Sequence, residues 1–182
     1  LLAAANKSQW KDRPSPLPAS SGSVATGRGI ALADRGNTYV GAVAEVEVEK
    51  ASGNVRVKRI TIAHDCGLIV NPDGLKNQIE GNIIQGVSRS LMEEVQFDAS
   101  GVKNNDWSSY PILTFADVPD VEFALINRPE MPARGGGEPA IVPVPAAIAN
   151  AIFDATGVRL REIPFTPKRV LAGLKSLSPQ PA

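Results

Sequence analysis

The sequence has 182 residues, of which 43% are hydrophobic and 21% charged, as expected for one soluble globular domain with its own core. Lysine plus arginine equals aspartate plus glutamate at 19 each, so net charge favours neither nucleic acid nor an anionic membrane as a partner. No apolar run approaches the ~20 residues of a membrane span. The single Cys66 excludes an internal disulfide and leaves the compartment open.

The N-terminal segment differs in composition from the rest of the chain. Residues 1–10, "LLAAANKSQW", are typical of the end of a helix, and residues 11–27 are rich in proline, serine and glycine. Such a composition indicates an irregular connector. We therefore expect a helix tail and linker over residues 1–25, a domain over residues 26–182, and a chain that is a piece of something larger.

Hydrophobic alternation predicts three strands in succession. They span residues 28–34, 37–50 and 55–65. In the second, apolar side chains face one way and glutamates the other, which is the period of two that a half-buried strand requires. The turn sequence "ASGN" between the second and third strands predicts that they pair as a hairpin.

The period then changes to that of a helix over residues 71–95. Asn71 is suited to cap the N-terminus and Pro72 to occupy the first helical position. An apolar residue recurs at every fourth position and forms one stripe: Leu75, Ile79, Ile83, Val87 and Leu91. Gly81 and Gly86 lie inside this helix, where each costs about 1 kcal/mol against alanine. We therefore expect the helix to pack closely against another element.

The remaining elements follow at irregular intervals. Residues 121–127 read as a strand, residues 144–157 as a buried helix that ends at a glycine cap, residues 159–165 as a short strand, and residues 166–177 as a helix. Strands and helices do not alternate as in a regular βαβ array. The sequence therefore predicts an α+β fold, with a mixed or antiparallel sheet and packed helices.

The segment "RGGGEP", residues 134–139, presents one carboxylate after three glycines. Glycines let the backbone approach a ligand closely, and their successive amides can form an anion-binding concavity. Glu138 beside such a concavity could act as a general base, and Pro139 stiffens the chain that follows. The alternative is a flexible surface loop with one solvated glutamate. Arg134 could neutralise an anion or could be an ordinary solvated residue.

Two other groups carry chemical side chains. The Gln-x-Glu-Gly segment that begins at Gln78 places an amide near the start of the long helix, where it could hydrogen-bond a planar heterocycle; the alternative is a polar helix surface. His64 and Cys66 flank Asp65 at the end of a strand. Because a zinc site needs three or four ligands and His64 is the chain's one histidine, we expect these to be structural residues.

These motifs together resemble a known family. The segments "DCGLIVNPDGLKNQIEGNIIQGVSRSLMEEV", "SSYPILTFADVPDVEF", "GGGEPA" and "PAAIANAIFDATGVRLREIPFTPKRVL" occur in this order. Their order and spacing are similar to those of the xanthine dehydrogenase/aldehyde oxidase family, the molybdenum hydroxylases. The resemblance runs from about residue 26 to residue 174. It is to the C-terminal part of the large molybdopterin-binding subunit, of the bacterial isoquinoline oxidoreductase and aldehyde dehydrogenase type.

The resemblance implies roles for three residues. Glu138 would lie beside molybdenum as the catalytic base that takes a proton from a Mo–OH group, Gln78 would contact the pterin, and Gly137 would bring backbone close to the metal. It also implies a molybdopterin cytosine dinucleotide cofactor and oxidation of an aldehyde or N-heteroaromatic carbon, with water as the oxygen source. No residue of this chain is expected to ligate the metal itself.

Other parts of the family's active site are missing from these 182 residues. The sequence contains no Gly-Gly-x-Phe-Gly loop and no cysteine set for an iron–sulfur cluster. We therefore expect this chain to form one wall of the site. The remainder of the molybdopterin-binding subunit, or a partner chain that carries it, would complete the site, and 2Fe-2S clusters would lie on a partner subunit. The alternative is an isolated or truncated domain that assembles but has no activity of its own.

Overall fold

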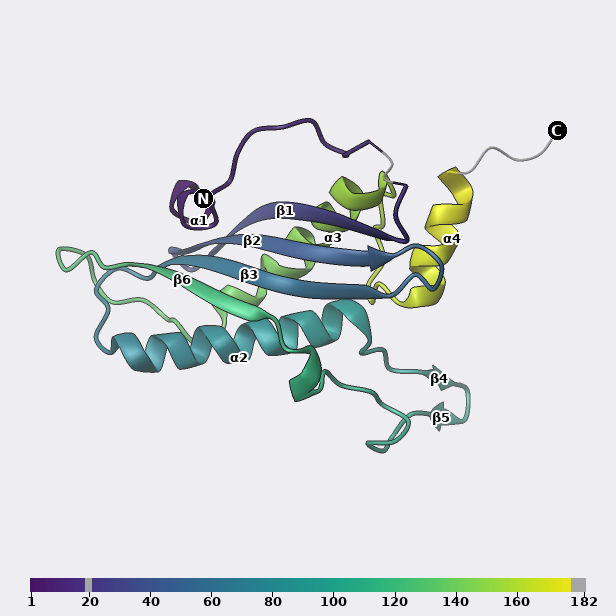
Figure 1. The fold of residues 1–182 in the computed structure, drawn as a ribbon. Coiled ribbons are helices and arrows are strands. Elements are labelled where there is room, and N and C mark those ends of the chain that lie inside the picture. The colour runs from purple at the N-terminus through teal and green to yellow at the C-terminus, as the bar shows by residue number, and fades with distance from the viewer. Residues whose placement is uncertain (19–20, 178–182) are drawn as a thin grey trace.

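The computed structural model describes residues 1–18 and 21–177. Its centre is a four-stranded sheet in the order β1-β2-β3-β6, with two long helices on one face (Figure 1). The strands are β1 (Val24–Arg35), β2 (Thr38–Glu49), β3 (Val55–Asp65) and β6 (Asp120–Ile126). The helices on this face are α2 (Pro72–Leu91) and α3 (Val144–Thr156).

The sheet is mixed. β1, β2 and β3 form an antiparallel meander, whereas β6 pairs with β3 in parallel. The parallel pair requires a crossover, and α2 lies in it between β3 and β6. The predicted α+β class with a mixed sheet and packed helices is therefore confirmed, as is the hairpin of residues 37–50 and 55–65.

The core lies between the sheet and the two helices. All five members of the predicted α2 stripe, Leu75, Ile79, Ile83, Val87 and Leu91, are buried. At the N-terminus of the helix, the Asn71 side chain accepts a hydrogen bond from the Gly74 amide at 2.9 Å, as predicted for an N-cap. The sequence stripe therefore identified the buried face and the start of the helix correctly.

The helix ends at Leu91 rather than at residue 95 as predicted. The side chain of Asn104 provides the physical reason. It donates to the Glu94 carbonyl at 2.6 Å and accepts from the Gln96 amide at 2.7 Å, so these backbone groups bond across a loop instead of within a helix. The Glu94 carboxylate in turn pairs with Arg169 at 2.8 Å.

β1 and α3 approach each other unusually closely. A Cβ atom built on Gly27 would lie 2.2 Å from the Ala151 carbonyl oxygen, and one on Gly29 would lie 2.2 Å from the Ala147 carbonyl oxygen. Helix backbone therefore occupies the space that side chains would need. α3 ends, as predicted, at Gly157, whose φ of 78° is in the left-handed region that favours glycine.

The predicted strand over residues 159–165 is wrong. Residues 158–166 are irregular and lead into α4 (Pro167–Leu177). The Phe165 amide donates at 2.6 Å to the Ser90 carbonyl, near the end of α2, and Pro164 has no N–H to offer to a sheet. Phe165 is therefore buried in the core beside α2, although its segment does not join the sheet.

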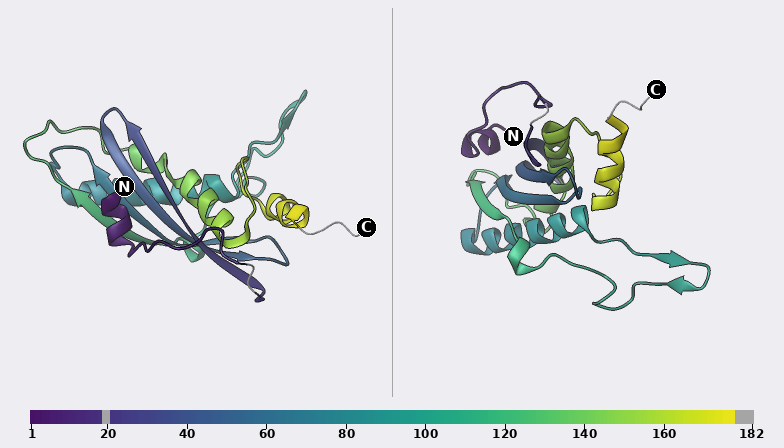
Figure 2. Two further views of the ribbon diagram at one scale, coloured as in Figure 1. Left: turned by 90° about the horizontal axis from the view of Figure 1, so that it is seen from above. Right: turned by 45° about the vertical axis from the view of Figure 1, so that its right-hand side comes forward.

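The opposite face of the sheet carries the N-terminal segment. α1 (Leu2–Lys7) packs Ala4 against Val43 and Ala63. The Arg28 guanidinium lies over the Trp10 ring, 4.2 Å from its centroid. The first residues are thus attached to the sheet on the face away from α2 and α3, as the views in Figure 2 show.

An arm that runs from the end of α2 to β6 extends away from the body (Figures 1 and 2). It includes the two-residue strands β4 (Phe97–Asp98) and β5 (Gly101–Val102) and the 3₁₀ turn η1 (Phe115–Asp117). Trp107 is 83% exposed and Phe115 is 98% exposed. Exposed aromatic side chains on a projecting segment are the kind of apolar surface that marks contact sites.

One helical stretch among the described residues, Pro139–Thr156, is long and apolar enough to cross a membrane by length and composition. More than half of it, 56%, is buried inside the domain. Its α3 part packs on β1, which is the behaviour of a core helix.

An ion pair at the back of α3 gives the first testable prediction. The buried Asp154 carboxylate binds the Arg13 guanidinium at 2.5 Å and accepts from the Arg28 amide at 2.9 Å. Burial alone would raise the pKa of Asp154, but hydrogen bonds from Arg13, the Arg28 amide and Ser15 outweigh it, so the pKa is lowered. A depressed pKa means that the charged form stabilises the fold above the ordinary carboxyl pKa, and that this stability is lost as pH falls through the folded value.

Asp154→Asn should therefore lower the free energy of unfolding by about 2 kcal/mol at pH 7, the usual worth of hydrogen bonds to a charged group. The difference from wild type should shrink at acid pH well below the ordinary carboxyl pKa, as the wild-type carboxyl becomes protonated. Urea unfolding of both proteins at the two pH values measures this. An equal difference at both would contradict the role assigned to the charge.

Candidate functional site

The glycine loop that carries Glu138 is fixed at its beginning by backbone groups. The Arg134 amide donates to the Cys66 carbonyl at 2.8 Å, just beyond the end of β3. The Gly135 carbonyl accepts from the buried Thr38 hydroxyl, at the start of β2, at 3.0 Å. The loop therefore lies across the ends of two neighbouring strands and is attached to both of them.

Asn82 of α2 fixes the loop at its end. Its side-chain nitrogen donates to the Gly137 carbonyl at 2.6 Å, and also to the Gln78 carbonyl one turn earlier at 2.6 Å. Its side-chain oxygen accepts from the Ile141 amide at 3.1 Å. Ile141 ends the short 3₁₀ turn η2 (Pro139–Ile141) that follows Glu138, so one side chain holds both ends of the segment around the carboxylate.

A polar cleft of about 450 Å³ opens between α2, this loop and the tip of the β1–β2 hairpin. Its lining residues are Arg35, Asn77, Gln78, Gly81, Asn82, Gln85, Arg89, Gly137, Glu138 and Ile141. Gln78, Gly137 and Glu138, the three residues that the sequence singled out, therefore line one cleft.

The side chains at the cleft are open to a ligand. Glu138 is 71% exposed, and its Oε2 pairs with the Arg35 guanidinium at 2.6 Å. Within residues 1–18 and 21–177, Oε1 of Glu138 and the side-chain amide of Gln78 have no hydrogen-bond partner. Arg35 and Arg89 add two cationic groups to the lining, so the cleft combines positive charge with unpaired donors and acceptors.

The three glycines of the loop differ in whether the surrounding chain leaves room for a side chain. At Gly136 an added Cβ would lie 2.7 Å from Leu75, so packing inside the chain favours glycine there. At Gly135 nothing lies within 4 Å, and at Gly137 the nearest atom is Oε1 of Gln78 at 3.6 Å, an ordinary contact. Internal packing therefore does not explain Gly135 and Gly137, whereas a ligand that needs close backbone approach would.

The helix glycines divide in the same way. Gly86 packs against Val144, 3.0 Å from a built Cβ, as the prediction of close helix packing requires. Gly81 has nothing within 4 Å and opens into the cleft. The expectation that the helix packs closely against another element is therefore confirmed at Gly86, whereas Gly81 meets nothing within 4 Å in the part of the chain that the structure describes.

His64 and Cys66 do not line the cleft. His64 is fully buried on β3, where burial lowers the pKa of the imidazole against the opposing charge of Asp65. Burial, aided by Asp65, raises the pKa of the Cys66 thiol. Both side chains are therefore held in their neutral forms, and neither ring nitrogen of His64 has a hydrogen-bond partner among the described residues. Arg134 lines a separate hollow together with Tyr39 and Arg128.

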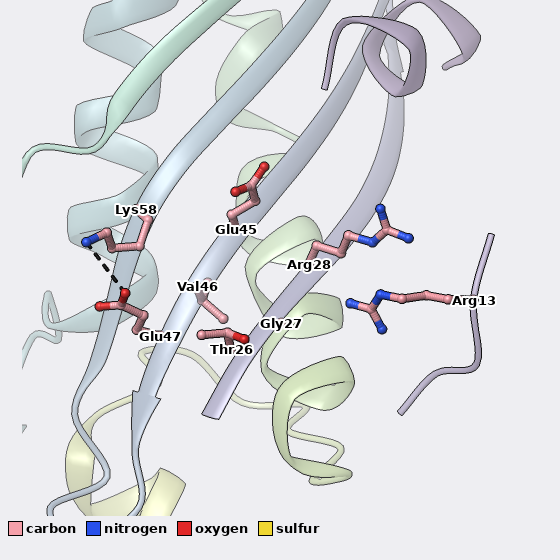
Figure 3. A pocket seen from close by; sticks show the side chains of 8 residues that line it. All are labelled: Arg13, Thr26, Gly27, Arg28, Glu45, Val46, Glu47 and Lys58. Atoms are coloured by element: carbon pink, nitrogen blue, oxygen red, sulfur yellow. Dashed lines mark ion pairs between the residues drawn. The ribbon is translucent and has the colours of Figure 1, made fainter. Parts of the chain in front are cut away.

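A second hollow of about 440 Å³ lies on the opposite face of the sheet (Figure 3). Its cations are already engaged: Arg13 binds Asp154, Lys58 lies 3.5 Å from Glu47, and the Arg28 guanidinium donates to the Lys11 carbonyl and lies over the Trp10 ring. It contains none of the residues that the sequence identified. Among the described residues, no three His, Cys, Asp or Glu side chains gather as a metal site.

Sequence reasoning missed Asn82 and Thr38. Asn82 had a readable signal, because it lies three residues after Ile79 on the apolar stripe of α2, and a polar side chain on a buried stripe needs a partner. Thr38 had no such signal, since its partner is a carbonyl 97 residues away.

Comparison with known proteins shows what this arrangement is similar to. Residues 8–119 match the family model described as molybdopterin cofactor-binding domain. The chain is 44% identical over 183 residues to one of the subunits of nicotinate dehydrogenase from Pseudomonas putida KT2440, covering 96% of this chain and 15% of that protein. It is 33% identical to the beta subunit of isoquinoline 1-oxidoreductase from Brevundimonas diminuta, covering 96% of this chain and 21% of that protein.

Solved structures show the same fold. Quinoline 2-oxidoreductase from Pseudomonas putida 86 superposes with a TM-score of 0.70 and 31% identity, covering 76% of this chain and 19% of that chain. Aldehyde oxidoreductase from Desulfovibrio gigas gives 0.68 and 33%, covering 76% and 15%. The chain spans only about 15% to 21% of the length of these relatives.

Proposed function

This chain belongs to the molybdopterin-binding xanthine dehydrogenase/aldehyde oxidase family, and on that premise we propose that it forms the catalytic-glutamate wall of a molybdenum hydroxylase site. The observation that carries the proposal is the convergence of Gln78, Gly137 and Glu138 on one cleft. These residues come from a helix and a loop that are far apart in sequence. A purely structural role would not require their polar groups to face the same open space.

The residues of the cleft fit a molybdopterin dinucleotide. Gly135 and Gly137 leave room that side chains would fill, and the Gln78 amide offers both a donor and an acceptor to a pterin ring. Arg35 and Arg89 suit the phosphates of the dinucleotide, which we propose to be the cytosine form. When bound, the cofactor supplies two-electron redox chemistry and oxygen activation that amino-acid side chains lack.

Glu138 is the proposed general base. With Oε2 paired to Arg35, Oε1 is the atom available to accept a proton from the water-derived oxygen nucleophile as it attacks the substrate carbon. The cleft is open in this chain, whereas a base works best where water is excluded. The remainder of the molybdopterin-binding subunit, or a partner chain that carries it, would close the cleft and complete the cofactor site.

The names of the relatives support a proposal for the substrate class. Their names specify nicotinate, isoquinoline, quinoline and aldehydes as what those proteins act on. We propose an aldehyde or an N-heteroaromatic ring as substrate, with water as the oxygen source and electrons leaving through 2Fe-2S clusters on a partner subunit.

Composition analysis of the native complex tests this function. Mass spectrometry should find further chains purified with this one, metal analysis should find molybdenum and iron, and acid hydrolysis should release CMP from the cofactor. A stable monomer that retains molybdenum and turns over by itself would contradict the need for the other chains. A complete complex without molybdenum would contradict the cofactor assignment.

Gln78→Ala tests the pterin contact. Because the side chain is exposed and unbonded here, its loss should leave the fold intact, whereas the cofactor would lose a hydrogen-bond partner. An unsatisfied buried group costs about 1–3 kcal/mol, so cofactor affinity should fall roughly 5- to 150-fold. Glu80→Ala is the matched control, because Glu80 is exposed on the same helix outside the cleft. Equal molybdenum retention after gel filtration in both variants would refute the contact.

A further inference from the structure

We propose that Asn82 is a positioning residue, which sets the orientation of Glu138 and couples it to Gln78 through a single side-chain amide. The inference rests on the proposed function for its catalytic consequence, but its structural part stands on this chain alone. Asn82 is 9% exposed and sits on α2 where it faces the loop.

The three hydrogen bonds of Asn82 use one amide almost to its capacity. An asparagine side chain has two donor hydrogens and one acceptor oxygen. Here the nitrogen donates to the carbonyls of Gln78 and Gly137, and the oxygen accepts from the Ile141 amide. A hydroxyl has one donor, and a carboxylate has none. Serine could therefore reproduce only the bond within the helix, and aspartate could reproduce only the bond to Ile141.

Because the peptide bond is planar, these hydrogen bonds also restrict the orientation of the Glu138 backbone. The Gly137 carbonyl belongs to the peptide unit that also contains the Glu138 nitrogen, and that unit is planar. Holding the carbonyl on Asn82 therefore fixes the plane in which Glu138 begins and directs the Glu138 N–H away from Asn82. Three residues later, the Ile141 amide is held by the same side chain. Glu138 thus lies between two fixed points.

The bond to Gln78 links the two proposed functional residues. Asn82 holds the main chain of Gln78, and it holds the loop that carries Glu138. A shift of the loop is therefore a shift relative to the turn of α2 that bears the proposed pterin contact. Because misplacement by about 1 Å can cost ~10²-fold in rate, loss of this link should slow catalysis without removing any group that touches substrate.

Asn82→Ser in the full chain, assembled with the rest of its subunit, is the central test. Amide hydrogen exchange of Ile141 should quicken by about tenfold, because this amide loses its acceptor on Asn82 and keeps only the bond to the Glu138 carbonyl at 3.2 Å. The kcat per bound molybdenum should fall roughly 10- to 100-fold, with KM within about twofold of wild type. Asn82→Asp should leave the Ile141 amide protected, because a carboxylate oxygen can still accept from it, and should lower kcat, because the bond to the Gly137 carbonyl is lost.

Ser90→Ala is the matched control, because Ser90 is also buried on α2 and donates to the Gly86 carbonyl at 2.6 Å within the helix. It should leave exchange of the Ile141 amide at the wild-type rate, and a similar acceleration there would overturn the proposal. So would wild-type exchange, or wild-type kcat, in Asn82→Ser when Glu138→Gln is inactive. If Glu138→Gln is fully active, the proposed function fails, and exchange alone then decides whether Asn82 positions the loop.

Discussion

Glu138→Gln in the assembled enzyme should lower kcat per bound molybdenum by 10²–10⁴-fold, the usual worth of general-base catalysis. Glutamine keeps the shape of the side chain and loses the basic oxygen. The ion pair with Arg35 is lost as well, but an exposed pair contributes about 0–1 kcal/mol to stability, so the fold should be unaffected. The loss should fall on kcat rather than KM, because the base acts in the transition state.

Two further variants sharpen this experiment. Glu138→Asp keeps the charge but withdraws the carboxylate by about one methylene, so it should also be poor, by ~10²-fold. Glu130→Gln removes another exposed glutamate from the segment before the glycines and should behave as wild type. Turnover is measured per molybdenum with an intact cofactor in every sample. Equal turnover for wild type and Glu138→Gln would contradict the assignment of Glu138 as the general base. It would favour the alternative of a domain that assembles but supplies no catalytic group.

Gly29→Ala should be strongly destabilising. A Cβ there would lie 2.2 Å from the Ala147 carbonyl oxygen and 2.3 Å from the Ala151 nitrogen, both of them helix backbone atoms. Neither can move without shifting α3 off β1. Overpacking typically costs 1–3 kcal/mol, and backbone obstruction places this site at or above about 3 kcal/mol. The midpoint of thermal unfolding should fall by roughly 6–12 °C.

Gly22→Ala controls for the general effect of replacing a glycine. An added Cβ at Gly22 would find only the Val24 carbonyl oxygen, at 3.7 Å, which is an ordinary contact. Its unfolding midpoint should stay within about 1–2 °C of wild type. If Gly29→Ala also unfolds at the wild-type temperature, the close packing of α3 against β1 does not contribute to stability as described.

Local sequence signals predicted the elements well where one periodicity dominates. The α2 stripe and the alternation in β2 each reflect one buried face, and both are found. The predictions that failed depended on distant partners. The end of α2 is set by Asn104 and Arg169, and residues 159–165 bond to Ser90 instead of a strand.

The same distinction holds at the cleft. Gln78 and Glu138 were identified as candidates from their side-chain chemistry and received roles from a family resemblance, and the fold places both at one cleft. The loop's attachment could not be read locally, because Thr38 reaches it from 97 residues away. Even the Arg35 pair depends on the tip of the β1–β2 hairpin meeting a loop that follows β6. Such contacts follow from topology, which a local pattern does not contain.

The bond between Asn82 and Gly137 joins positions 55 residues apart, and this separation has a consequence for biosynthesis. A ribosome adds about 5–20 residues per second, so α2 leaves it roughly 3 to 11 s before the glycine loop does. During that interval Gln78 is exposed on α2, and the glycine loop that forms the other side of the cleft has not yet been made. Loading of a cofactor into this cleft would therefore have to follow completion of translation of the loop, and a ribosome stalled between the two segments would release a chain that has the first contact and lacks the base.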